Sequence, residues 1–242
     1  MSAPVKPDIQ TYVTLMKEVK LRMAVLEFFG SGKGHALYQP STVESCCLQI
    51  RKILELIAVG SLAANKDIYS AAYEKFASHW HAGRLLRDLE RINPNFYPKP
   101  IVEVPSKTPG VVNELQERGP DYLTKAEFEK LYDECGAIMH SRNPYGQPVD
   151  YVWYQQQLRE WYRKIMNLLN SHQIHLVHHP GFFLIHVKVD QDDEVHFFEF
   201  VPCCKTVVDD HFDPSRPPIV GHFHVSLRRL ILIEALLAGT CS

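Results

Sequence analysis

Several features that would assign this chain to a common class are missing from its sequence. It has no run of about 18 apolar residues, so we expect no transmembrane helix. Its first residues, MSAPVKPDIQ, lack the basic and then apolar segments of a secretory signal. The serine-hydrolase motif GxSxG and the zincin motif HExxH are also absent. We therefore expect a cytoplasmic protein without a membrane partner.

Cysteines at metal-binding spacing are missing as well. The chain has six cysteines and none stands in a CxxC unit, while neighbouring cysteines rarely bridge to each other. In a reducing cytosol such thiols act as small apolar side chains. We therefore predict that Cys46, Cys47 and Cys135 lie in the core.

Histidines are frequent near the end of the chain, where a metal site is the less favoured interpretation. His222 and His224 on a strand would point to one face, and Cys203–Cys204 would supply thiolates. No compact HxH and carboxylate unit accompanies them, and surface histidines explain the pattern more simply. We predict no metal and no cofactor.

The charge is nearly balanced, with 26 Lys and Arg against 28 Asp and Glu, so the whole surface does not attract nucleic acid. Arg84, Arg87 and Arg91 are an exception because helical spacing puts them on one strip. Such a strip can neutralise RNA phosphates. The nearby Asp88 and Glu90 favour the alternative of a solvated face with ion pairs.

Apolar residues that recur every three to four positions predict helices at about 8–29, 41–64, 68–92, 124–143 and 150–171. Ser41 with Glu44, and Thr124 with Glu127, match the capping box that begins a helix. GSGKG (30–34) follows a helix instead of a strand, so we interpret it as a connector and not as a phosphate loop.

The remaining segments predict strands. In the proline-rich stretch 94–123, IVEV (101–104) and VV (111–112) are suited to pair as a short hairpin. Segments 182–189, 195–201 and 222–225 are rich in β-branched and aromatic residues. QDDE (191–194) lies between the first two and predicts that they pair as a hairpin. Segment 226–237 fits a strand or a helix.

Together these patterns predict a mainly α (α+β) fold, a bundle of about five helices with a small C-terminal β-containing part. The predicted bundle domain is 1–172, including the excursion at 94–123, and the predicted β-rich subdomain is 173–242.

The segment CGAIMHSRNPYG (135–146) brings polar side chains together where a helix ends. His140 would act as general acid or base, Arg142 would bind a phosphate, and Asn143 would orient the substrate. The alternative is a plain helix end, in which His140 and Arg142 complement the helix dipole and Asn143-Pro144 stops the helix.

Arg51 and Glu55 lie one turn apart beside the apolar stripe of the second predicted helix. A partly buried arginine paired with a glutamate would position a substrate phosphate or hold the end of a neighbouring helix. An ordinary surface ion pair is the alternative.

Two segments, VESCCLQIRKILELIA (43–58) and FEKLYDECGAIMHSRNPYG (128–146), resemble helices of the HEPN superfamily in order and spacing. The resemblance implies an α-helical bundle, a homodimer and metal-independent ribonuclease activity, carried by an arginine and a histidine four to six residues later. His140 matches the histidine by context. Asp133, Glu134 and Cys135 stand where the arginine would be.

The leading hypothesis is therefore a HEPN-like protein that binds or cleaves RNA in bacterial stress or phage defence. His140, Arg142 and Asn143 would form its catalytic site, and Arg51 with Glu55 would help to bind substrate, as would Arg84, Arg87 and Arg91. The competing hypothesis is a non-catalytic dimerising module for a partner protein, with 182–189 as a potential edge strand.

Overall fold

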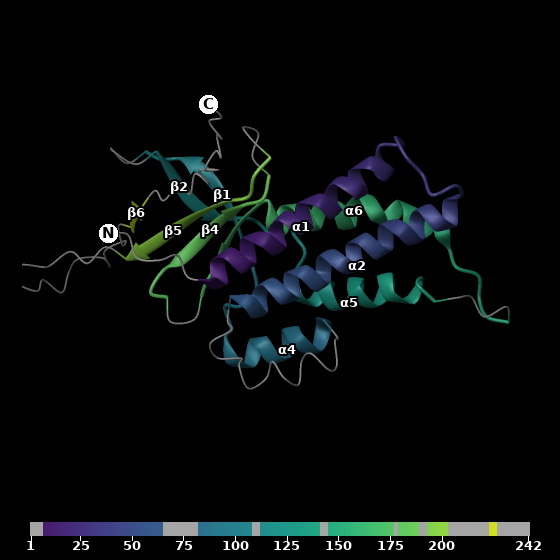
Figure 1. Ribbon diagram of the computed structural model, residues 1–242, viewed down its shortest axis with the longest axis horizontal. Coiled ribbons are helices and arrows are strands. Elements are labelled where there is room, and N and C mark those ends of the chain that lie inside the picture. Colours follow the sequence, from purple (N-terminus) through teal and green to yellow (C-terminus); the bar gives the residue numbers. More distant parts are fainter. Residues whose placement is uncertain are drawn as a thin grey trace, which may run out of the picture.

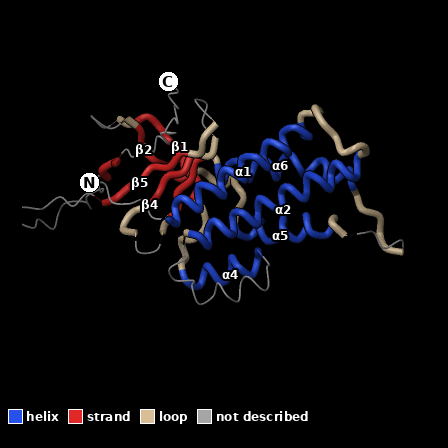
Figure 2. The backbone as a smooth tube through the Cα atoms, in the orientation of Figure 1, coloured by secondary structure: helices blue, strands red, loops and turns tan. Residues whose placement is uncertain are grey.

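The computed structural model describes residues 7–64, 82–107, 112–140, 145–176, 179–188, 193–202 and 223–226. These ranges hold the helices α1 (Pro7–Gly30), α2 (Gln39–Ala63), α4 (Ala82–Ile92), α5 (Lys125–Ala137) and α6 (Tyr151–Leu169). They also hold the strands β1 (Lys99–Pro105), β2 (Asn113–Glu117), β3 (Ser171–Ile174), β4 (Phe182–His186), β5 (His196–Pro202) and β6 (Phe223–Ser226). Figures 1 and 2 show the helices gathered at one end and the strands at the other.

The described helices pack around α2. This helix contacts α1, α4, α5 and α6. Its buried side chains, which include Cys46, Ile50 and Ile57, recur at the spacing that the sequence predicted. Cys46, Cys47 and Cys135 are all buried free thiols, which confirms the prediction that they belong to the core.

One predicted helix start is confirmed and one is wrong. The Thr124 hydroxyl accepts a hydrogen bond from the Glu127 N–H, and the Glu127 side chain reaches back to the Thr124 N–H, so this capping box is complete. The box predicted at Ser41 and Glu44 does not form. The helix begins earlier, after Tyr38, and the Ser41 hydroxyl donates to the Tyr38 carbonyl at 3.0 Å.

The sheet overturns the predicted fold class. Within the described residues, six antiparallel strands form one sheet in the order β2-β1-β3-β4-β5-β6. The protein is therefore a mixed α+β fold with a prominent sheet and not a bundle with a small β part. Two of the strands come from the proline-rich stretch. The predicted hairpin exists, but Ile101 pairs with Glu117, so its second strand is 113–117 instead of 111–112.

The hairpin joins the sheet because β1 pairs with β3, at Lys99 opposite Gln173 and Pro100 opposite His172. These residues are far apart in the sequence, and neither periodicity nor composition reveals such a pairing. The pairing of β4 with β5, which are close in sequence, was predicted and is confirmed.

A buried hydrogen bond joins α1 to the sheet. The Tyr12 hydroxyl and His172 Nε2 lie 2.7 Å apart, and neither side chain is more than 1% exposed. His172 Nδ1 lies 2.7 Å from the Leu169 carbonyl, which only accepts, so Nδ1 carries the proton and Nε2 accepts from Tyr12. Burial lowers the pKa of His172 to about 4, so the ring is neutral.

Some predictions fall partly outside the described residues. Of the helix predicted at 68–92, the structure describes Ala82–Ile92. Segment 227–237 is outside, while β6 overlaps the strand predicted at 222–225. No described helix is both long and apolar enough to cross a membrane.

Candidate functional site

The predicted catalytic segment lies just after α5. The helix ends at Ala137, and His140 follows it as an exposed side chain. Within the described part of the chain, His140 makes no hydrogen bond or ion pair that would orient its ring. Arg142 and Asn143 lie outside the described residues. A catalytic role for these three residues stays a prediction.

Arg51 and Glu55 lie next to each other on α2, and both side chains take part in the contact of α2 with α5. Arg51 Nη1 donates to the Tyr132 carbonyl at 3.0 Å, and Nη2 donates to the Tyr132 hydroxyl at 2.7 Å. The guanidinium lies 3.8 Å above the Tyr132 ring, and Nε lies 3.6 Å from Glu55. A Cβ on Gly136 would lie only 2.4 Å from Arg51 Nη1. Arg51 therefore fastens α5 to α2.

The arginine strip of α4 carries ion pairs. Arg87 contacts Glu129 at 3.0 Å, and Arg91 contacts Asp88 at 3.4 Å. The Arg84 side chain lies outside what the structure describes. The observed pairs agree with the alternative of a solvated face. RNA binding by this strip stays a prediction, as do the homodimer and the partner protein.

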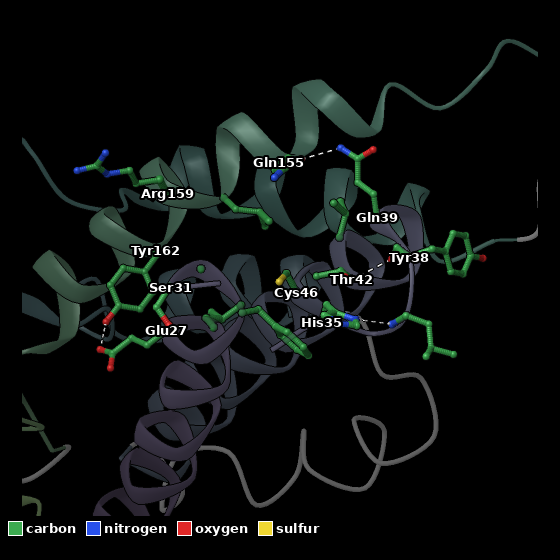
Figure 3. A pocket seen from close by; sticks show the side chains of 16 residues that line it. Glu27, Ser31, His35, Tyr38, Gln39, Thr42, Cys46, Gln155, Arg159 and Tyr162 are labelled. Atoms are coloured by element: carbon green, nitrogen blue, oxygen red, sulfur yellow. Dashed lines mark hydrogen bonds between the residues drawn. The ribbon is translucent and has the colours of Figure 1, made fainter. Parts of the chain in front are cut away.

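A pocket that the sequence did not predict lies between the end of α1, the connector 31–38, the start of α2 and one face of α6 (Figure 3). Its volume is about 750 Å³. We call it the α6 pocket. The lining side chains are Leu26, Glu27, Phe29, Ser31, His35, Leu37, Tyr38, Gln39, Thr42, Val43, Cys46, Gln155, Leu158, Arg159 and Tyr162, together with Gly30.

The wall that α6 contributes follows from helical spacing. Gln155, Leu158, Arg159 and Tyr162 stand at positions i, i+3, i+4 and i+7, so they share one face of the helix. From the first to the last of them the helix rises by roughly 10 Å, which sets the length of this wall.

Two hydrogen bonds bridge the pocket, one at each end of this wall (Figure 3). Gln39 Nε2 donates to Gln155 Oε1 at 2.7 Å and links the start of α2 to α6. The Tyr162 hydroxyl donates to the Glu27 carboxylate and links α6 to the end of α1. The pocket is therefore a slot between two bridges.

The bottom of the slot is apolar, and its rim is polar except at Leu37. Leu26, Val43 and Cys46 are at most 7% exposed, whereas Gln155 and Arg159 are exposed. Burial raises the pKa of the Cys46 thiol to about 11, and the neighbouring Cys47 adds to the shift. Cys46 is therefore a neutral thiol at physiological pH and packs as an apolar group.

The two charged groups of the lining differ in their partners. The hydrogen bond from Tyr162 lowers the pKa of Glu27; burial opposes this, and Lys188, whose Nζ lies 3.2 Å away, adds to the lowering. Among the residues that the structure describes, Arg159 has no hydrogen bond or ion pair. The slot thus presents one cation that has no counter-ion.

The connector places a strained leucine at the rim. Leu37 has a φ of 67°, the left-handed conformation that glycine favours, and its side chain is 91% exposed. His35 Nδ1 accepts from the Leu37 N–H at 3.2 Å, and Thr42 Oγ1 accepts from the Ala36 N–H at 2.9 Å. Hydrogen bonds from the backbone N–H groups of Ala36 and Leu37 therefore hold the connector in place.

Sequence reasoning missed this site because its residues come from separate segments. Of its residues, Cys46 was predicted as a core side chain, and it is buried. The available signal was weak: Gln155, Arg159 and Tyr162 form a polar stripe on α6, and an ordinary solvent-exposed helix face has the same pattern.

The described residues contain no group of three or more His, Cys, Asp or Glu side chains placed to hold a metal ion. Comparison with known protein families, with curated proteins and with solved structures finds no match for this chain.

Proposed function

We propose that this protein is a binding protein for a small, largely apolar molecule that occupies the α6 pocket. The observation that carries the proposal is the pocket itself, with a volume of about 750 Å³, an apolar bottom and a polar rim. Ligand sites of folded proteins have volumes of about 300–1,000 Å³ and the same division into apolar and polar lining.

Binding fits the lining better than catalysis does. Ser31 Oγ donates to the Phe28 carbonyl at 3.1 Å, and His35 Nδ1 accepts a backbone N–H, so these two side chains are not paired as nucleophile and base. The Cys46 thiol is neutral at physiological pH. The described lining therefore offers contacts to a ligand and no activated nucleophile.

The proposal is tested with N-phenyl-1-naphthylamine, a neutral apolar fluorophore. We expect saturable binding to one site. Gly30 lines the pocket, and a Cβ there has no heavy atom within 4 Å, so Gly30→Trp has room to fill the slot. This change should weaken binding about tenfold, or ~1.4 kcal/mol.

Gly119→Trp is the matched control, because a Cβ on Gly119 also meets no atom within 4 Å and the residue does not line the pocket. A second pair, Leu158→Asp against Leu56→Asp, compares two partly buried leucines inside and outside the lining. Equal affinities within both pairs, or fluorescence that does not saturate, would contradict the proposal.

A further inference from the structure

The charges around the α6 pocket select among apolar ligands. Apart from the histidine, its lining contains two ionisable side chains that are charged at neutral pH, Glu27 and Arg159. Glu27 is engaged by the Tyr162 hydroxyl and by Lys188 at 3.2 Å. Arg159 is exposed and, within the described chain, has no carboxylate partner. A cationic ligand would have to compete for Glu27, whereas an anionic ligand finds Arg159 available.

The position of Arg159 also gives the ligand a direction. Arg159 lies three residues before Tyr162, and Figure 3 shows it on the same side of the pocket as Tyr162 and Glu27. Tyr38 and Gln39 are on the opposite side in this view. The exposed Leu37 belongs to their segment. A charged group and an apolar surface thus stand toward opposite ends of the slot.

From this geometry we infer that the α6 pocket binds a single-chain amphipathic anion, a molecule with an acidic head at Arg159 and an apolar tail that runs over Leu158 and Val43 toward Leu37. A guanidinium binds a carboxylate or a phosphate through two parallel hydrogen bonds, which suits either kind of head. The apolar tail would cover Leu37, which is 91% exposed. This inference rests on the proposed function, since it names the class of ligand for the same pocket.

The test is a competition against bound N-phenyl-1-naphthylamine, with decanoate, decyl phosphate, decanol and decyltrimethylammonium as competitors below their micelle concentrations. These probes share one tail and differ in the charge and kind of head. We expect decanoate or decyl phosphate to displace the fluorophore at about fivefold lower concentration than decanol, the size typical of a partly exposed charge pair. The cationic probe should be the weakest, and added salt should reduce the advantage of the anions.

Arg159→Gln should remove the preference for the anions, so that decanoate and decyl phosphate compete no better than decanol in the same variant. Arg163→Gln is the control, because Arg163 stands one turn further along α6, pairs with Asp121 and Glu160, and does not line the pocket. It changes the net charge by the same amount and should keep the preference.

The outcomes separate the two proposals. If the fluorophore binds but all the heads compete equally, or if Arg159→Gln keeps the preference for anions, the inference about the ligand class is wrong and the binding function stands. A preference for the cationic probe would likewise contradict the inference about the ligand class and leave the binding function standing. If the fluorophore does not bind to the natural protein, the proposed function fails and the inference fails with it.

Discussion

Helix α1 takes part in a tyrosine hydrogen bond toward each of its ends, and the two bonds lie in different surroundings. Near the start of the helix, Tyr12 bonds to His172 of the sheet, and both side chains are fully buried. Near the other end, Glu27 bonds to Tyr162 of α6, and the Glu27 side chain is 46% exposed.

The comparison shows that the burial of a hydrogen bond determines which role the bond has in the protein. At the first site both partners are neutral, because burial lowers the pKa of His172 and raises that of Tyr12. Because both side chains are at most 1% exposed, the bond serves to hold the fold together. At the second site the carboxylate is charged and reaches solvent, and the bond bridges one end of the α6 pocket.

The largest expected effect is a loss of stability in acid that comes from the buried site. The pKa of His172 is about 4 in the folded protein and about 6.5 when the chain is unfolded. Between these pH values the unfolded state binds a proton at His172 that the folded state does not bind. The free energy of unfolding is therefore unaffected by the protonation of His172 above pH ~6.5 and decreases as the pH falls toward 4. The free energy of unfolding should fall by about 3 kcal/mol over this window.

Urea unfolding at a series of pH values measures this loss. His172→Gln is the reference, because it removes the titrating ring while the other acidic and basic groups remain. Its stability should change less with pH between 4 and 6.5. His175 contributes with the same sign in both proteins, since burial lowers its pKa as well. Parallel pH profiles for the two proteins would show that His172 is not the titrating group.

A smaller effect is expected from Tyr12→Phe. This change removes only the hydroxyl and leaves His172 Nε2 as a buried acceptor without its donor. The free energy of unfolding at neutral pH should fall by about 2 kcal/mol, the usual cost of such an orphaned group. Urea unfolding measures it. A loss no larger than that caused by Tyr162→Phe at the exposed site would contradict the claim that burial makes the Tyr12 bond the more important one for stability.

The smallest effect is expected from that matched change, Tyr162→Phe. The Glu27 carboxylate can turn to water and to Lys188, so the loss should be about 0.5 kcal/mol. The pKa of Glu27 should rise toward its ordinary value because the hydroxyl that lowers it is gone. An NMR-monitored titration of the Glu27 carboxyl group measures this, and an unchanged pKa would contradict the assigned hydrogen bond.

The sequence predicted local structure well where neighbours along the chain settle it. Thr124 and Glu127 are three residues apart, and their capping box is present. The same motif at Ser41 and Glu44 failed, because Tyr38 and the preceding connector offered Ser41 other hydrogen-bond partners. A local motif is thus reliable only when no competing backbone group is near.

The sites show a greater difference between prediction and structure. The spacing of Arg51 and Glu55 left open whether the pair binds a substrate phosphate or holds a neighbouring helix end. The structure shows that the two side chains meet and that Arg51 donates to Tyr132 of α5. His172 gave no signal in the sequence beyond being one of many histidines. Its burial follows from Tyr12, which lies 160 positions away.

The amphipathic stripes of α1, α2, α5 and α6 and the pairing of β4 with β5 were determined by the sequence alone, because each depends on residues within a few turns or one short hairpin. Tertiary structure decided that β1 and β2 join the sheet, that Arg51 lies on Tyr132, and that Arg159 faces a slot together with the end of α1. These features require segments distant in the chain to meet, and that meeting depends on the packing of the whole core.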